Sequence, residues 1–491
     1  MEAASALPGL ALLPAAAAVP LIVLSRRRPT LREACSLTAA LAQTAVLAAM
    51  VPDALRGAGP EWQALALAPG VPLALRADPL GVLFGVVASA LWVLTTVYSI
   101  GYTRALHEPA QTRYFAAFAL CLHATVGLAL AANLLTFFLF YEVLTVAAYP
   151  LVIHRGTREA TLAGRLYLAY TLTAGAALLG AVAWTGSLAG RLDFAPGGIL
   201  RGADASPAAL WGLLALFVVG LGVKAAVVPL HTWLPVAMIA PTPVSALLHA
   251  VAVVKAGVFG FVRVIGFTFG PDLLAAIGAA AALLALSGAT ILLGSLAAVA
   301  ADNLKRLLAF STVSQLSYVI LGAALGTPDA LTGGVLHMAS HAVLKITLFF
   351  CAGAIYVTTH LERVSELTGV GRRMPLTLGA FAVAAFMLAG LPPGIAFASK
   401  WRLVAGAAEA GAWAAVFVLL VSTLLNVAYF APIVVRAFSG PGGARVAEAP
   451  PAILVPLLLT AAAGLVLGLA PDTGHLLSLA RAVAASLTGT P

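Results

Sequence analysis

Five charged side chains lie inside long apolar runs, where a charge is costly. Glu142 lies within LLTFFLFYEVLTVAAYPLVI, too far from any loop for its short side chain to reach water, and Lys224, Lys255, Lys345 and Lys400 have similar surroundings. Each charge near the centre of a bilayer costs about 2.5–3.5 kcal/mol, so all five must face the protein interior. There they can pair, lose their charge or be hydrated. A buried lysine can exchange a proton near neutral pH because burial disfavours its charged form.

Histidine side chains add a candidate proton relay. His337, His341 and Lys345 recur at a spacing of four and lie on one helical stripe. Histidine titrates near pH 6.5, so the stripe can pass protons between water and a buried lysine. His249 is a further candidate, although it lies about 120° around a straight helix from Lys255, six residues later, so contact is not assumed. The alternative is that each histidine is a hydrogen-bonded core residue.

Proline interrupts two of the apolar runs. Pro229 and Pro235 lie in GLGVKAAVVPLHTWLPVAMIAPTPV, and Pro392 and Pro393 lie in FMLAGLPPGIAFASKWR. Proline removes a helical hydrogen bond and clashes with the preceding turn, which predicts a broken helix in each run. Irregular backbone at membrane depth is tolerated where it faces protein or a water-filled cavity, and paired breaks are typical of inverted repeats around a midplane pathway. The alternative is that the prolines only kink the helices for packing.

The composition indicates that these helices lie in a membrane. Of the 491 residues 62% are hydrophobic and 9% are charged, against about a quarter charged in a soluble domain, so a soluble fold is excluded. Because a spanning helix needs about 20 apolar residues, we expect about fourteen crossings. The runs are 5–25, 34–51, 79–100, 114–131, 133–153, 166–190, 208–239, 244–269, 273–300, 307–326, 329–357, 375–406, 409–437 and 452–471.

These runs predict an all-α polytopic membrane protein with two inverted five-helix repeats. Residues 1–110 would carry helices 1–3, residues 111–270 the first repeat of helices 4–8, and residues 271–440 the second repeat of helices 9–13. Residues 441–491 would hold helix 14 and a tail. The broken helices are then helices 7 and 12 of this count.

The basic residues predict the orientation, because connections on the inner side of a membrane are rich in lysine and arginine. With the amino terminus outside, the outward segments carry five basic residues: Arg56, Arg76, Arg191, Arg201 and Arg481. The inward connections carry sixteen: Arg26, Arg27, Arg28, Arg32, Arg104, Arg113, Arg155, Arg158, Arg165, Lys305, Arg306, Arg363, Arg372, Arg373, Arg436 and Arg445. We therefore expect a multi-pass protein of the bacterial inner membrane with both termini on the outer side. Topology, rather than a nucleic-acid partner, explains the net charge of +9.

The sequence also indicates what the chain does not carry. It lacks the P-loop GxxxxGK[ST], a GxGxxG opening a soluble helix, HExxH and GxSxG. Cys35, Cys121 and Cys351 lie far apart without a CxxC spacing, so we expect neither a metal site nor a cofactor. The predicted loops are too short for a catalytic domain, so any redox chemistry or nucleotide hydrolysis would belong to a partner subunit.

Four segments together resemble one family. They are KAAVVPLHTWLPVAMIAPTPVSALLHA from Lys224, VVKAGVF around Lys255, ADNLKRLLAFSTVSQLSY at 301–318 and LPPGIAFASKW at 391–401. They are similar to the antiporter-like proton-translocating membrane subunits of multisubunit Na⁺/H⁺ antiporters, respiratory complex I and membrane-bound hydrogenases. The resemblance covers residues 75 to 435 approximately. It implies fourteen helices, broken helices 7 and 12, and a line of ionisable residues at mid-membrane.

The resemblance also implies roles for single residues. Glu142 looks like the family's helix-five glutamate, Lys224 its helix-seven lysine and Lys255 its connecting lysine of helix eight. Lys400 looks like the lysine of the second broken helix. Because one complex I subunit type has glutamate there, Lys400 favours the D-type antiporter subunit or a hydrogenase relative, whereas His249 departs from the D-type pattern.

We therefore expect a proton-translocating subunit of a multisubunit complex, with a cation/proton antiporter favoured over a complex I-like oxidoreductase or a hydrogenase. Protons would enter near Glu142 and Lys224, which we expect to form an ion pair, pass Lys255 and the histidines, and leave near Lys400. The expected partners are other membrane subunits, the lipid bilayer and protons, with Na⁺ or K⁺, the direction and the driving reaction left open. The alternatives are a structural membrane scaffold and a self-contained secondary transporter.

Overall fold

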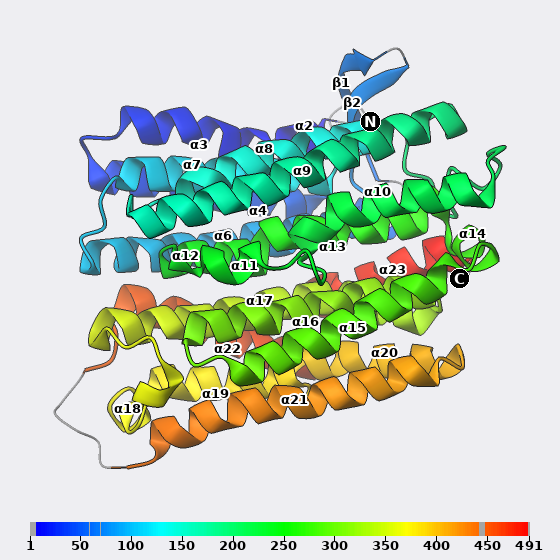
Figure 1. Cartoon of the computed structure of the whole chain (residues 1–491). Coiled ribbons are helices and arrows are strands. Elements are labelled where there is room, and N and C mark those ends of the chain that lie inside the picture. Colours follow the sequence, from blue (N-terminus) through cyan, green and yellow to red (C-terminus); the bar gives the residue numbers. More distant parts are fainter. Residues whose placement is uncertain (1–5, 58, 69, 441–446, 490–491) are drawn as a thin grey trace.

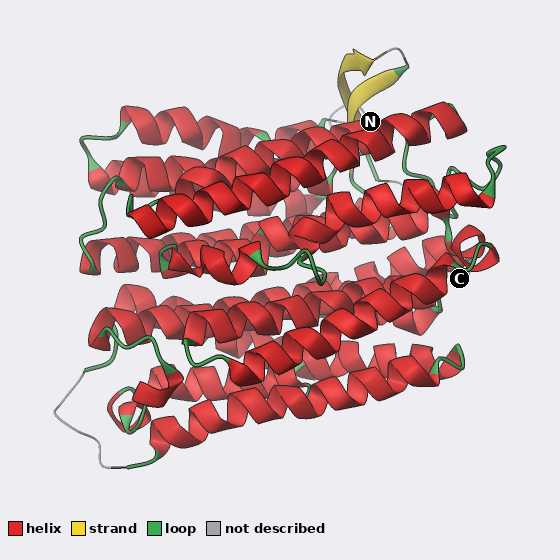
Figure 2. Ribbon diagram, viewed as in Figure 1, coloured by secondary structure: helices red, strands yellow, loops and turns green. Residues whose placement is uncertain are grey.

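The computed structural model describes residues 6–57, 59–68, 70–440 and 447–489. The helices lie side by side with their long axes in nearly the same direction, and a small β-hairpin projects at one end (Figures 1 and 2). Among the described residues, 13 helices are long and apolar enough to cross a membrane. The broken pair α19 and α20 supplies a fourteenth crossing, so the predicted all-α polytopic fold is confirmed.

The first half of the chain runs from the amino-terminal helices to the first broken helix and the crossing after it. Its elements are α2 (Leu7–Leu10), α3 (Leu13–Leu24), α4 (Pro29–Ala49), α5 (Val51–Leu55), β1 (Glu61–Ala68), β2 (Val71–Arg76), α6 (Pro79–Ala105), α7 (Gln111–Ala129), α8 (Leu134–Val152), α9 (Arg158–Ala189), α10 (Pro207–Ala225), α11 (Trp233–Val236), η1 (Ala237–Ile239), α12 (Thr242–Ala246), η2 (Leu247–Val251), α13 (Val253–Arg263) and η3 (Val264–Phe269). The last four form one crossing, Thr242–Phe269, in which η2 and η3 are π-helical.

The second half contains the second broken helix and the carboxy-terminal crossings. Its elements are α14 (Pro271–Ala276), α15 (Ala279–Ala300), α16 (Leu304–Leu325), α17 (Pro328–Thr359), η4 (Val364–Glu366), α18 (Val370–Arg373), α19 (Pro375–Ala389), α20 (Ile395–Glu409), α21 (Trp413–Phe438), α22 (Pro451–Leu469), η5 (Thr473–His475) and α23 (Leu476–Thr488).

Three elements were not expected from the sequence. Strands β1 and β2 pair antiparallel in the connection between the second and third crossings. The predicted run 273–300 divides into α14 and α15 at Gly278, whose φ of +74° favours glycine. Helix α23 follows the last crossing and packs against α6 and α17. All three escape a search for apolar runs, because each is too short to cross a membrane.

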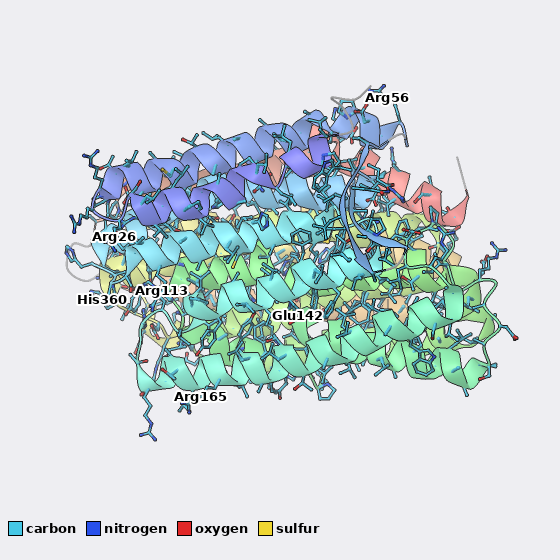
Figure 3. All side chains as sticks on the ribbon, turned by 90° about the horizontal axis from the view of Figure 1, so that it is seen from above. Arg26, Arg56, Arg113, Glu142, Arg165 and His360 are labelled. Carbon is cyan, nitrogen blue, oxygen red and sulfur yellow. The ribbon has the colours of Figure 1, made fainter. Side chains whose placement is uncertain are left out.

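Arginine side chains mark both ends of the bundle (Figure 3). Arg26, Arg113 and Arg165 lie at one end and Arg56 at the other (Figure 3). Both termini of the described chain lie toward the end that carries Arg56 (Figure 1). The termini and Arg56 thus share one end, opposite Arg26, Arg113 and Arg165 (Figures 1 and 3), and the side of the membrane that each end faces stays a prediction. Arg445 lies outside the described residues.

Helices α8 and α16 begin in the same way at opposite ends of the bundle. The side chain of Asn133 accepts a hydrogen bond from the Thr136 backbone N–H (2.8 Å), and that of Asn303 accepts one from the Arg306 N–H (3.1 Å). Both are asparagine N-caps, which satisfy a free backbone donor. Asn133 also forms an isolated antiparallel bridge to the loop after α9, and Asn303 forms one to the loop after α17. The two halves of the chain therefore repeat one local arrangement.

A buried ion pair joins two distant crossings of the first half. Arg263, which is 1% exposed, lies 2.6 Å from Asp78 through Nη1 and 2.9 Å through Nη2. Three phenylalanine rings surround the guanidinium, with centroids 5.0–5.1 Å from its central carbon. Asp78 also caps α6 by accepting from the Gly81 N–H (2.8 Å). The pair thus fixes the start of α6 against the end of α13.

Candidate functional site

The first helix break lies between α10 and α11. Helix α10 ends at Ala225, and Ala226 adopts a left-handed conformation with a φ of +57°. The Val223 carbonyl at the end of the helix accepts from the Ala226 N–H (3.1 Å) and also from Trp233 Nε1 (2.7 Å). Pro229 lies in the break as expected, whereas Pro235 lies within the short helix α11.

Lys224 lies in the last turn of α10 and is fully buried. Its amine donates to the backbone carbonyl of Tyr141 on α8 and lies 3.3 Å from the centroid of the Tyr141 ring. The Tyr141 hydroxyl in turn donates to the Gly220 carbonyl on α10 (2.7 Å). A carbonyl and a ring face both favour a cation, so the site can hold Lys224 in its charged form.

Glu142 follows Tyr141 on α8 and lies near the middle of the bundle's length (Figure 3). It is half-buried, beside the exposed side chains of Val143 and Val146. Its carboxylate lies against Gly175 of α9, where a Cβ atom would be 2.6 Å from Oε1. Among the described residues, Oε1 has no hydrogen-bond partner. Glu142 and Lys224 make no direct contact within 4.0 Å, and Lys224 donates to the backbone instead, although the two charges lie close enough to interact electrostatically.

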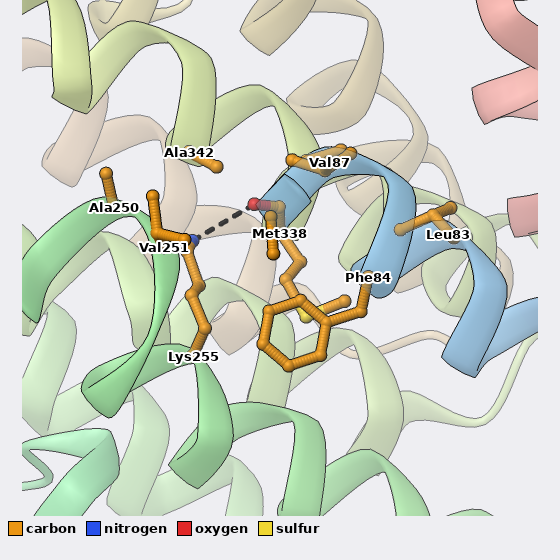
Figure 4. A pocket seen from close by; sticks show the side chains of 10 residues that line it. Leu83, Phe84, Val87, Ala250, Val251, Lys255, Met338 and Ala342 are labelled. Carbon is orange, nitrogen blue, oxygen red and sulfur yellow. Dashed lines mark hydrogen bonds between the residues drawn. The ribbon is translucent and has the colours of Figure 1, made fainter. Parts of the chain in front are cut away.

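Lys255 and His341 are in direct contact. Lys255 Nζ lies 2.9 Å from His341 Nδ1 and donates to the Met338 carbonyl at 3.0 Å. Figure 4 shows the amine beside a cavity of about 10 Å³ formed by α6, η2, α13 and α17. Apart from Lys255 its lining is apolar, and its volume is at the lower limit for one water molecule. Proton exchange between Lys255 and His341 therefore needs no intervening group.

His249 lies in the π-helical segment η2 and does not join this contact. Its ring packs against Phe349 with centroids 4.9 Å apart. Neither ring nitrogen has a hydrogen-bond partner among the described residues, although the side chain is fully buried. His249 is thus a buried polar group that Lys255 does not contact, as its angular position on a helix indicated.

The side chains of His337, His341 and Lys345 on α17 contact different neighbouring helices instead of forming one continuous row along α17. His337 Nδ1 lies 2.9 Å from Ser399 Oγ of α20, and its ring stacks on Tyr318 at 5.0 Å. Lys345 donates to Ser311 Oγ of α16 (2.9 Å). Since His341 contacts Lys255 of α13, the predicted stripe reaches three different helices. The ring centroids of His337 and His341 are 6.3 Å apart.

Lys400 of α20 turns back to the second helix break. Its amine donates to the carbonyls of Leu388 (2.9 Å) and Ala389 (3.1 Å), the last residues of α19. The break contains Pro392 and Pro393 and begins at Gly390, where φ is +104° and a Cβ atom would be 2.9 Å from the lysine Cδ. The carboxy-terminal end of a helix attracts a cation, so α19 stabilises the charged lysine.

Uncharged residues that the sequence analysis missed connect Lys345 to Lys400. Ser311, which accepts from Lys345, lies 3.0 Å from the Tyr429 hydroxyl of α21. The Tyr429 hydroxyl lies 2.5 Å from the side-chain amide of Asn426. When the amide oxygen faces Lys400, it lies 2.9 Å from Lys400 Nζ and 2.9 Å from Gln315 Nε2. Uncharged polar side chains add little to the free-energy cost of placing an apolar run in a membrane. Only their position within apolar helices could therefore have indicated these residues.

Comparison with known proteins identifies the family. Residues 131–426 match the membrane domain described as NADH:quinone oxidoreductase/Mrp antiporter, TM. The chain is 36% identical over 413 residues to NADH-quinone oxidoreductase subunit N of Desulforudis audaxviator, covering 80% of this chain and 81% of that protein. It is 34% identical over 344 residues to a probable K⁺/H⁺ antiporter subunit of Rhizobium meliloti, which covers 69% of this chain but 33% of that longer protein.

Solved structures share the fold over nearly the whole chain. A chain of the Mrp complex from Dietzia sp. superposes with a TM-score of 0.88 at 26% identity, covering 99% of this chain and 98% of that chain. A chain of an archaeal membrane-bound sulfane sulfur reductase has a TM-score of 0.87 at 24% identity, which shows the fold alone. The chain therefore belongs to the NADH:quinone oxidoreductase/Mrp antiporter family of membrane subunits.

Proposed function

We propose that this membrane subunit translocates protons within a multisubunit cation/proton antiporter. The proposed pathway comprises Glu142, Lys224, Lys255, His249, His337, His341, Lys345 and Lys400. The observation that carries the proposal is the direct contact of two groups that can each gain or lose a proton, Lys255 and His341, at 2.9 Å inside the bundle. As a membrane subunit of this family, the chain is not itself a catalytic redox subunit.

The first step would bring a proton to Lys224 from the end rich in arginine. A cavity of about 480 Å³ opens there and reaches Pro235, next to the first break. Its lining contains both signs of charge, with Arg155, Lys305, Arg306 and Glu362. A cavity of this size holds many water molecules, which can conduct protons toward the break.

The middle step would transfer the proton laterally from α10 to α13. The two helices pack closely beside both lysines, since a Cβ atom on Gly257 would clash with the Ala225 backbone nitrogen. From Lys255 the proton passes to His341, and His337 and Ser399 then lead to α20. Protonating one group disfavours a charge on its neighbour, so each transfer promotes the next.

The last step would release the proton from Lys400. Moving one charge across 100 mV takes about 2.3 kcal/mol, which the differences between these environments can supply. The carbonyls of α19 hold the charged lysine, and release requires the neutral amine. Na⁺ or K⁺ remains the candidate counter-ion, and the other membrane subunits and the lipid bilayer are the proposed partners.

The matching starts of α8 and α16 support two inverted repeats, residues 111–270 and 271–440, between residues 1–110 and 441–491. The end that carries Arg26, Arg113 and Arg165 is then the inner side of a bacterial inner membrane, with both termini outside.

A complex I-like oxidoreductase is the second candidate, favoured by the 36% identity to a subunit N. The 0.88 TM-score to an Mrp complex chain favours the antiporter. Purification of the native complex distinguishes the two, since an antiporter moves protons in vesicles when a cation gradient is applied, whereas a redox-driven complex requires an electron donor.

The same vesicle assay tests the proposal against a scaffold and against a self-contained transporter. We expect proton movement by the assembled complex and none by the purified chain alone. Full cation/proton exchange by the chain alone would show a self-contained transporter. If the complex keeps its full transport rate when the pathway lysines can no longer exchange protons, the chain is a scaffold.

A further inference from the structure

Three oxygen atoms surround the amine of Lys400. Two are the carbonyls of Leu388 and Ala389, at 2.9 and 3.1 Å, and the third is the Asn426 amide oxygen at 2.9 Å. A charged lysine has three N–H donors and no lone pair, whereas the neutral amine has two donors and one lone pair. The three acceptors therefore match the charged form.

The other end of the same amide leads to Lys345. With its oxygen toward Lys400, the Asn426 nitrogen donates to the Ser422 carbonyl (3.2 Å) and the Tyr429 hydroxyl (2.5 Å). Tyr429 lies 3.0 Å from Ser311, which accepts from Lys345 at 2.9 Å. Asn426 thus lies between the two lysines in a chain of buried polar groups.

A half-turn of the amide reverses this chain. The Asn426 oxygen then accepts from the Tyr429 hydroxyl (2.5 Å), and its nitrogen points toward Lys400 and Gln315. The lone pair of a neutral lysine amine can accept from that nitrogen. Gln315 Oε1, which is buried and without a partner among the described residues, can also accept if the glutamine amide turns. One orientation suits charged Lys400 and the other neutral Lys400.

We propose that Asn426 is a positioning residue for Lys400. Its amide oxygen stabilises the charged lysine, and its rotation transmits the charge state of Lys400 to Lys345 through Tyr429 and Ser311. An amide does not release a proton near neutral pH, so it couples the two lysines by turning rather than by passing a proton. The inference rests on the proposed function of Lys400 and Lys345 in proton transfer.

Two substitutions of similar size test the role of the amide. Asn426→Asp keeps an acceptor toward Lys400 in every orientation, and Asn426→Leu removes it. Proton transport by the native complex in vesicles is measured against pH. Because a hydrogen bond from the charged amine stabilises its charged form, the pH of half-maximal transport should rise by about one unit or more in Asn426→Asp and fall by as much in Asn426→Leu.

Opposite shifts distinguish this role from a structural one, which would lower the rate in both variants without moving their pH profiles apart. Ser422→Ala is the matched control, since Ser422 is buried one turn earlier on α21 and its hydroxyl bonds to Ser295 (3.2 Å) rather than to a lysine. It should keep the wild-type profile. Unshifted profiles, or shifts in the same direction, overturn the inference.

Tyr429→Phe keeps the inference testable if the Asn426 variants fail to assemble. It retains the ring and removes the hydroxyl between Asn426 and Ser311, so we expect a fall in transport rate of about 2- to 10-fold. A wild-type rate overturns the coupling. If Lys400→Arg is inactive while these variants behave as wild type, only this inference fails, and if Lys400→Arg is fully active, the proposed function itself fails.

Discussion

The two broken helices hold their lysines by different means. At the first break, Trp233 donates to the Val223 carbonyl, and Lys224 donates to the carbonyl of Tyr141 on a neighbouring helix. At the second break, Lys400 itself takes two freed carbonyls of α19. Among the described residues, neither lysine has a carboxylate within 4.0 Å.

The difference shows how two similar breaks can serve two tasks. The backbone dipoles at the end of α19 are fixed, so they favour a charge on Lys400 whatever its neighbours carry. Lys224 has one backbone acceptor and a ring face, and the nearby Glu142 can be charged or neutral. We infer that the charge on Lys224 follows that of Glu142, whereas the charge on Lys400 follows the local hydrogen bonds.

The largest effect is expected from Lys400→Arg. Arginine keeps the positive charge but does not lose its proton in proteins, so proton release at the second break should stop. We expect transport by the native complex to fall at least tenfold, equivalent to about 1.4 kcal/mol or more, with normal assembly.

Arg402→Lys is the control on the same helix, because Arg402 pairs with Asp329 at 2.6 Å near the surface. It should leave transport unchanged. A wild-type rate in Lys400→Arg would mean that protons leave elsewhere or that the lysine is only a structural cation.

Glu142→Gln should have the next largest effect and tests the first site. Glutamine has nearly the same shape but cannot become charged, so Lys224 loses the group that we expect to control it. Transport should be abolished or nearly so, whereas the amount of assembled protein, measured by gel filtration, should be preserved. Glu159→Gln in the exposed first turn of α9 is the matched control. Loss of the assembled protein in Glu142→Gln would instead indicate a structural role.

Gly175→Ala should have a smaller effect at the same site. An added Cβ atom would be 2.6 Å from Glu142 Oε1, so the carboxylate must move. Because the displaced atoms are the far end of a flexible side chain, we expect a partial loss of transport with little change in stability. Gly180→Ala on the same helix, where the nearest atom would be 3.9 Å away, should be neutral in both measurements. Equal behaviour of the two variants would show that the position of the carboxylate is not critical.

Asp302→Asn should have the smallest effect, because it changes only the loop before α16. The Ser365 hydroxyl and backbone N–H, helped by Arg363 and Arg436, lower the pKa of Asp302. A lowered pKa stabilises the fold above the ordinary carboxyl pKa, and the stabilisation is lost as the pH falls through the folded-state pKa. The variant should lower Tm by no more than about 2 °C at neutral pH. The difference should shrink below about pH 4, and a constant difference would contradict this origin.

The sequence predicts those parts of the fold that the bilayer requires, namely the membrane crossings. Apolar runs of spanning length and paired prolines are visible without coordinates, so the crossings and both breaks were expected. The chain has five lysines, and four of them lie in apolar runs, so their inward orientation followed from the cost of lipid exposure. The hairpin β1–β2 and helix α23 are too short for this argument.

The contacts of the site depended on information that spacing does not contain. His337, His341 and Lys345 share one stripe, but the packing of α17 against three helices decides that each has a different partner. The expected Glu142–Lys224 pair required a distance between helices, which no spacing provides. Asn426 and Tyr429 are uncharged, so the electrostatic argument that found the lysines passed over them.

The buried pair of Arg263 and Asp78 has a consequence for biosynthesis. Arg263 lies near one end of its crossing, where it meets the start of α6, and its partner is 185 residues earlier in the chain. Because the ribosome makes α6 long before α13, the carboxylate is already present when the arginine enters the membrane. The order of synthesis thus allows α13 to insert against α6 rather than into lipid alone.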